Sequence, residues 1–73
     1  MDIPYWTDRF REEKGRVPRD YAELCQFVSG QTNARMQLEP YARVDFAVLA
    51  SGQRQAECYS DTGQESVITW GKK

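Results

Sequence analysis

The apolar residues of this 73-residue chain change their spacing once, near Gly30, and this change constrains the fold most strongly. Before Gly30 the apolar residues recur every three or four positions, as on one face of an α-helix. After residue 42 they alternate with polar residues, as in the strands of a sheet that is covered on one face. We therefore expect an α+β fold in which two N-terminal helices pack on one face of a three-stranded antiparallel β-meander.

The second helix is predicted over residues 18–29. Pro18 suits the first helical position, because its missing N–H would have no partner there. Gly30 is expected to end the helix in the left-handed conformation. The buried face of the helix is predicted from four apolar residues at helical spacing, which are Tyr21, Leu24, Cys25 and Val28.

The first helix is predicted over residues 3–14, with Asp2 as its cap and Gly15 just past its end. Its apolar stripe consists of Ile3, Trp6 and Phe10. A domain of this size buries only about 60% of its unfolded surface, so its core needs every large side chain. We therefore expect the stripe to pack on the core. An anchor for a partner protein is the alternative use of these aromatic residues.

Three strands are predicted over residues 43–50, 54–59 and 65–70. Turn residues separate them, namely Ser51-Gly-Gln53 and Asp61-Thr-Gly63. Before the first strand, residues 31–34 read as a polar connection and residues 35–38 as a short strand or loop that ends near Pro40. The whole chain, residues 1–73, is expected to form a single domain.

The register of the first two strands follows from the face that each side chain must occupy. A three-residue first turn sets Val48 opposite Ala56. The same turn sets Phe46 opposite Cys58, so the core face is apolar on both strands. The predicted core face of the sheet comprises Val44, Phe46, Val48, Ala56, Cys58, Ile68 and Trp70.

Charge and hydropathy limit which partners and which cellular location we expect for this chain. The formal net charge is −1, from ten Lys and Arg against eleven Asp and Glu, which gives no general attraction to nucleic acid or to an anionic membrane. No apolar run approaches the roughly 20 residues that a membrane span needs, and the N-terminus does not resemble a signal peptide. We expect a cytoplasmic protein. Cys25 and Cys58 are then expected to be reduced thiols in the core, with a disulfide between helix and sheet as the alternative.

The chain lacks the residues that most catalytic and metal sites use. It contains no histidine, which is the commonest general base and metal ligand. The two cysteines are too few for a structural zinc site, and the isolated glycines form no phosphate-binding loop. We therefore expect a binding module that is not an enzyme and that uses no cofactor or metal.

The stretch Lys14-Gly-Arg-Val-Pro-Arg19 is the most basic part of the chain and is a candidate docking patch for an acidic partner. The alternative is a solvated surface with ion pairs such as Glu12–Arg16 or Asp8–Arg11. Tyrosine and arginine are enriched in binding hot spots, and the edge of the sheet carries both. The predicted protein-binding residues are Tyr5, Arg9, Lys14, Arg16, Arg19, Tyr41 and Arg43.

Two local resemblances involve the same basic stretch. Residues 14–24, Lys-Gly-Arg-Val-Pro-Arg-Asp-Tyr-Ala-Glu-Leu, resemble the K-G-x-x-P-x-x-x-x-E-L stretch of type II secretion pseudopilins. This likeness implies a soluble assembly domain, although the apolar N-terminal helix of those proteins is missing here. The stretch also resembles the entry to some small helix-turn-helix or winged-helix DNA-binding proteins, which implies a DNA-binding function.

A third resemblance concerns the character of the whole chain. Its small size, near-zero net charge and lack of histidine are similar to those of small phage-encoded transcription regulators. This resemblance implies binding to bacterial RNA polymerase through its β′ subunit, inhibition of σ-dependent initiation and antitermination later in infection. The location would then be the host cytoplasm. From the sequence itself we expect a monomer that binds no membrane and does not bind nucleic acid directly. The resemblance carries over no individual residue.

Overall fold

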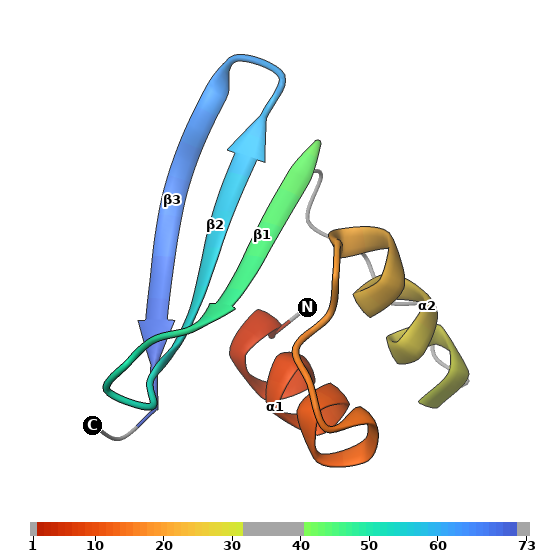
Figure 1. Ribbon diagram of the computed structural model, residues 1–73. Helices are drawn as coiled ribbons and strands as arrows, with labels where there is room; N and C mark the ends of the chain where they lie inside the picture. The colour runs from red at the N-terminus through yellow and green to blue at the C-terminus, as the bar shows by residue number, and fades with distance from the viewer. Residues whose placement is uncertain (1, 32–40, 72–73) are drawn as a thin grey trace.

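The computed structural model describes residues 2–31 and 41–71, and it confirms the expected α+β fold (Figure 1). The three strands form one antiparallel sheet in the order β1-β2-β3, and both helices lie on the same side of it. β3 lies farthest from the helices. The elements are α1 (Ile3–Lys14), α2 (Tyr21–Gln31), β1 (Arg43–Val48), β2 (Arg54–Ser60) and β3 (Gly63–Trp70). The connection predicted over residues 32–40 lies outside the described residues.

α1 has the bounds and the caps that the sequence predicts. The Asp2 carboxylate accepts a hydrogen bond from the Tyr5 backbone N–H at 3.2 Å. Gly15 follows the helix with φ of 76°, and its N–H donates to the Arg11 carbonyl at 2.9 Å. Glycine adopts this left-handed conformation without a steric penalty, so the chain can leave the helix here and turn toward α2.

α2 begins and ends later than predicted. Its first residue is Tyr21, because the Asp20 carboxylate accepts the Glu23 backbone N–H at 2.8 Å and so caps the helix. Pro18 is fully buried in the segment before the helix and does not start it. Gly30 lies inside the last turn, has no positive φ and does not end the helix, which continues to Gln31.

The sheet has the predicted faces but a different register between β1 and β2. Phe46 pairs with Ala56, and Val44 pairs with Cys58, so each partner is displaced by two residues. A shift of two keeps every side chain on its face, whereas a shift of one would turn all of them over. The predicted three-residue turn is wrong because β1 already ends at Val48. The connection over residues 49–53 is closed by the Leu49 N–H, which donates to the Gln53 carbonyl at 2.7 Å.

The ends of the strands also differ from the prediction. Val48 pairs with Arg54 at the end of the sheet and is 44% exposed, so its predicted place in the core is wrong. β2 and β3 extend to Ser60 and Gly63, which pair with each other across a tighter turn than expected. Ile68 pairs with Ala56 and Trp70 with Arg54, and both side chains pack against the core from the face that the sequence predicts.

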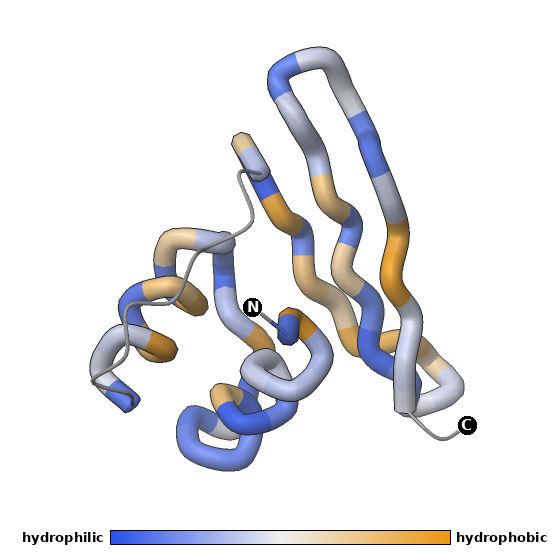
Figure 2. The backbone as a smooth tube through the Cα atoms, turned by 180° about the vertical axis from the view of Figure 1, so that it is seen from behind, coloured by the Kyte–Doolittle hydropathy of each residue, from blue (hydrophilic) through white to orange (hydrophobic). Residues whose placement is uncertain are grey.

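The core consists of two apolar clusters that meet at Phe46. One lies between the helices and the sheet and contains Ile3, Tyr21, Val44, Ala56 and Cys58. The other lies between the two helices and contains Phe10, Leu24 and Val28. Polar and apolar residues alternate over the first half of β1 (Figure 2), and this strand contributes Val44 and Phe46 to the core from one face of the sheet.

Both cysteines occupy the core positions that the sequence predicts, and both are thiols in the structure. Cys58 is fully buried, and Cys25 packs partly buried against the same cluster. Burial raises the pKa of the Cys25 thiol, because the thiolate would lose hydration there. A protonated, half-buried thiol behaves as a small apolar side chain rather than as a nucleophile.

A polar contact joins α1 to the sheet beside these clusters. Asp8 accepts from Arg54 through both carboxylate oxygens, with Nε at 3.0 Å and Nη2 at 3.2 Å. The Trp70 indole N–H donates to the same carboxylate at 3.1 Å. Gly71 covers the guanidinium so closely that a Cβ atom there would lie 2.6 Å from Arg54. Asp8 therefore links α1 to β2 and to the end of β3.

Replacing Asp8 by alanine is expected to lower the free energy of unfolding by about 1–2 kcal/mol, because three charge-assisted hydrogen bonds lose their acceptor. Urea unfolding followed by circular dichroism measures this change. Glu12→Ala is the matched control, since Glu12 is exposed on the same helix and makes no ion pair among the described residues. Equal stability of the two variants would contradict the linking role of Asp8.

Thr7→Val is expected to raise the free energy of unfolding by about 1 kcal/mol. The Thr7 side chain is fully buried, and its hydroxyl finds no hydrogen-bond partner in the part of the chain that the structure describes. Valine keeps the shape of threonine and removes the cost of burying that hydroxyl. The midpoint of thermal unfolding tests this, and a lower midpoint for the variant would show that the hydroxyl contributes to stability.

Candidate protein-binding surface

Glu23, in the first turn of α2, organises the basic stretch that precedes the helix. Its carboxylate accepts from Arg16 Nη1 at 2.8 Å and from Arg16 Nη2 at 3.0 Å, which is a two-point ion pair. It also accepts the Arg19 backbone N–H at 2.7 Å, and Arg19 Nη2 lies 3.5 Å from it. These contacts fold residues 16–19 back against the start of α2.

The same contacts set the protonation of Glu23. Hydrogen bonding from Arg16 and then from the Arg19 N–H lowers the pKa of this carboxyl to about 2, from an ordinary value of 4.5. The pairing also raises the pKa of Arg16. We call the contacts of Glu23 with Arg16 and Arg19 the clamp. Glu23 and Arg16 stay charged over the whole physiological pH range, so the clamp does not open by titration near neutral pH.

Arg16 also packs on an aromatic ring of α1. Its guanidinium carbon lies 5.3 Å from the centre of the Phe10 ring, within the range of a cation–π contact. Phe10 meets Phe27 edge-to-face at 5.1 Å, and Phe27 meets Trp6 at 6.5 Å. Tyr5 continues this row of rings at 5.1 Å from Trp6. A row of aromatic side chains therefore runs along the two helices and ends at Arg16.

A hollow of about 330 Å³ opens where the end of α1 meets the start of α2. Phe27 is half-buried beside it, Lys14 is exposed at its rim, and Arg19 continues the same edge of the molecule with a side chain that is 81% exposed. We call the set Lys14, Arg16, Arg19 and Phe27 the basic–aromatic surface. The residues that line the hollow are Phe10, Lys14, Arg16, Glu23, Gln26 and Phe27.

Three of the seven predicted contact residues thus come together, and the other four lie elsewhere. Tyr5 is 53% exposed at the far end of the aromatic row. Arg9 lies on α1 with a buried Nε that has no hydrogen-bond partner among the described residues, so part of its guanidinium faces the protein interior. Neither residue lines the hollow.

Tyr41 and Arg43 belong to the sheet. The Tyr41 ring lies edge-to-face on Tyr21 at 6.0 Å, beside the core. Arg43 points to the uncovered face of the sheet, where its guanidinium stacks over the Tyr59 ring at 4.1 Å and its Nε lies 3.4 Å from Asp45. The Tyr59 hydroxyl donates to Glu57 at 2.8 Å, and this bond raises the pKa of Tyr59.

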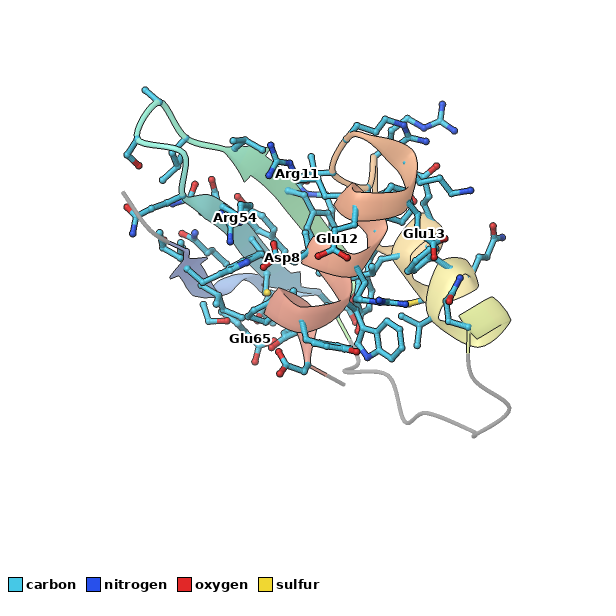
Figure 3. The ribbon with its side chains drawn as sticks, turned by 90° about the horizontal axis from the view of Figure 1, so that it is seen from below. Asp8, Arg11, Glu12, Glu13, Arg54 and Glu65 are labelled. Carbon is cyan, nitrogen blue, oxygen red and sulfur yellow. The ribbon has the colours of Figure 1, made fainter. Side chains whose placement is uncertain are left out.

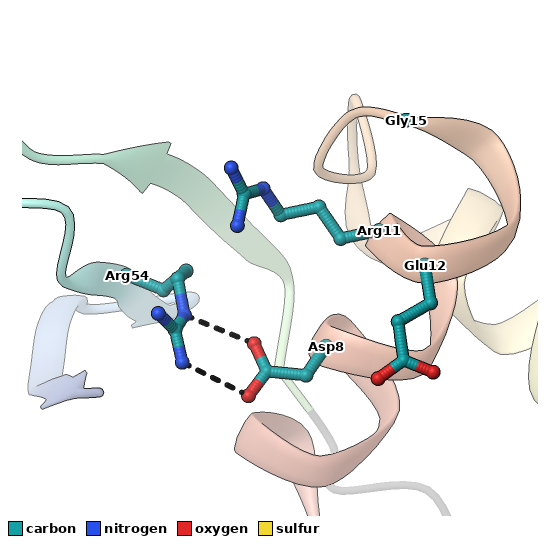
Figure 4. Close-up of a pocket in the computed structure, with 5 residues that line it drawn as sticks. All are labelled: Asp8, Arg11, Glu12, Gly15 and Arg54. Carbon is teal, nitrogen blue, oxygen red and sulfur yellow. Dashed lines mark hydrogen bonds and ion pairs between the residues drawn. The ribbon is translucent and has the colours of Figure 1, made fainter. Parts of the chain in front are cut away.

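A second hollow, of about 360 Å³, lies between α1 and the start of β2 (Figure 4). Arg11 points toward the sheet, and Glu12 points away from Arg54 (Figure 4). Glu13 lies on the side of α2, where Gln31 Nε2 donates to it at 3.4 Å (Figure 3). The charges of two carboxylates and two guanidiniums cancel in this hollow, and Asp8 is already paired with Arg54. The residues that line the hollow therefore favour a structural role over ligand binding.

The expected pairs Glu12–Arg16 and Asp8–Arg11 are replaced by pairs between segments, since Arg16 binds Glu23 and Asp8 binds Arg54. Sequence reasoning also missed Phe27 and Gln26 as lining residues. Phe27 follows Leu24 by three positions, so helical spacing could have placed it at the rim of the α2 stripe. Nothing in the sequence marks Arg54, which is 46 residues from its partner.

The chain was compared with protein families, curated proteins and solved structures. No protein-family model, curated protein or solved structure matches the chain. Within residues 2–31 and 41–71, no cluster of Cys, Asp and Glu side chains is placed to hold a metal ion. In those same ranges, neither helix has the length and apolar character that crossing a membrane requires.

The low pKa of Glu23 predicts an acid-dependent loss of stability. Its folded-state pKa of about 2 lies below the ordinary 4.5, so the clamp stabilises the fold fully above pH 4.5. This stability is lost as the pH falls from 4.5 toward 2. Urea unfolding at a series of pH values should show a smaller decline in that range for Glu23→Gln than for the parent chain. Parallel curves for the two proteins would contradict the clamp.

Proposed function

We propose that this chain is a non-enzymatic regulator that binds a protein partner through the basic–aromatic surface. The observation that carries the proposal is the convergence of Lys14, Arg16 and Arg19 beside Phe27 at one edge of the helical pair. Among the described residues, Glu23 is the only carboxylate that lines the hollow, and two of the cations already share it. The surface therefore keeps positive charge for an acidic partner.

The geometry suits a partner that offers both a carboxylate and an apolar side chain. Arg16 is held by Glu23 and Phe10, so it loses little side-chain freedom when it contacts a partner. Phe27 offers a half-buried ring next to the cations, and aromatic and arginine side chains supply most binding hot spots. A short acidic segment that carries one large apolar residue fits these features.

The partner we propose is bacterial RNA polymerase, with inhibition of initiation and altered termination as the outcome. Support for this partner comes from the resemblance of the whole chain to small phage-encoded regulators. The proposal agrees with a surface that offers cations and an aromatic ring for binding a protein. The subunit of the polymerase that we propose as the contact is β′.

DNA binding is the competing function for a basic helical surface. α2 would be the recognition helix, yet it contains no lysine or arginine, and Glu23 lies in its first turn. Base readout and phosphate contact both depend largely on such cations. The cations here lie before α2 and at the end of α1, which favours a protein partner over the major groove of DNA.

Capture from a bacterial lysate tests this proposal. The tagged chain is expected to retain RNA polymerase subunits at moderate salt, with or without nuclease. The double variant Lys14→Glu, Arg19→Glu should lose most of this retention, because it reverses the two cations that contribute least to the fold. Arg11→Glu, Arg43→Glu is the matched control, since it changes the net charge equally and leaves the basic–aromatic surface intact.

Equal retention by both double variants would exclude the basic–aromatic surface as the contact. Retention that disappears with nuclease would move the function to nucleic-acid binding. Circular dichroism of each variant shows whether the fold is preserved, so that a loss of binding is not confused with unfolding.

A further inference from the structure

β3 is the longest strand and the least covered one. It runs over Gly63–Trp70 at one edge of the sheet, and the helices lie over the opposite part (Figure 1). Apart from Ile68 and Trp70, which are half-buried, every residue of the strand is exposed. One row of its backbone N–H and carbonyl groups faces away from β2 with no neighbouring strand among the described residues.

Natural proteins usually protect such an edge, and β3 has little of this protection. The strand contains no proline and no lysine, and its only charged residue is Glu65. The irregular pairing with β2 is confined to the first part of β3, near Glu65. From Ser66 to Trp70 the pairing is regular, and Val67 in the middle is 48% exposed. This segment is a template for another strand.

We infer that β3 pairs with β3 of a second copy of this chain, antiparallel and centred on Val67. Each Val67 would lie opposite Val67 of the second copy, on the face of the sheet that the helices leave open. Ser66 would lie opposite Ile68 of the second copy, and Glu65 opposite Thr69. The sequence alone predicts a monomer, and the open edge of β3 is the reason to replace that expectation.

The distribution of charge makes β3 compatible with a second copy of itself and favours the antiparallel direction. In the antiparallel arrangement the two Glu65 positions are four residues apart along the strand, or about 13 Å, which is beyond the Debye length at physiological salt. A parallel arrangement in register would set the two carboxylates directly opposite each other. With no other charge in β3, the antiparallel pair has no ionic repulsion to overcome, and it covers the exposed valines.

This pairing also determines where the helices of the two copies lie relative to each other. A two-fold axis through the Val67 pair stands perpendicular to the joined sheet, so both pairs of helices lie on the same side of it. The basic–aromatic surfaces of the two copies would then face the same way. The contact between two strand edges is small, so we expect a dimer that forms at micromolar to millimolar concentration rather than an obligate one.

Sedimentation of the full chain over that concentration range tests the inference. The parent chain is expected to shift from monomer to dimer, and Val67→Lys to remain a monomer. Val48→Lys is the matched control, since Val48 is a similarly exposed valine on β1 and should leave the dimer unchanged. A parent chain that stays monomeric throughout, or equal effects of the two valine variants, would overturn the inference.

Charge changes at Thr69 test the register and do not depend on how Val67→Lys folds. Thr69→Lys sets a cation opposite Glu65 of the second copy and should tighten the dimer several-fold. Thr69→Glu sets two carboxylates opposite each other and should weaken it by a similar factor. Adding Glu65→Lys to Thr69→Glu should restore dimerisation. Identical association of the Thr69 variants would show that the strands do not pair in this way.

Discussion

One carboxylate joins the helical layer to the sheet. Asp8 accepts two hydrogen bonds from Arg54 and one from the Trp70 indole, so α1 is fixed against the start of β2 and the end of β3. The apolar clusters supply the larger driving force, but burial is not directional. The ion pair supplies direction, because a two-point contact between Arg54 and a carboxylate fixes how far α1 can slide along the sheet.

The fixed position of α1 in turn determines the candidate binding surface. Phe10 and Lys14 follow Asp8 on the same helix, and they meet α2 at the place where Glu23 gathers Arg16 and Arg19. Glu23 thus fixes the loop between the helices in place, just as Asp8 fixes the helical layer against the sheet. In both places one acid with several donors positions segments that the apolar core alone would leave free to shift.

Local patterns predicted most of the fold, and contacts between distant segments did not follow from them. Both ends of α1 were predictable because Asp2 and Gly15 act on neighbouring backbone groups. The pairing of β1 with β2 was not, since it depends on how the connection after Val48 closes. The basic–aromatic surface could be predicted only in part, because its cations are neighbours in sequence while Phe27 is added by the packing of α2 on α1.

Hydrogen–deuterium exchange of the chain, alone and with purified bacterial RNA polymerase, tests whether the basic–aromatic surface binds the polymerase. Backbone amides between the end of α1 and the first turns of α2, over residues 14–27, should exchange more slowly when the polymerase is present. Exchange on the uncovered face of the sheet, around Arg43, should change little. Protection limited to that face, or no protection at any polymerase concentration, would rule out binding through the basic–aromatic surface.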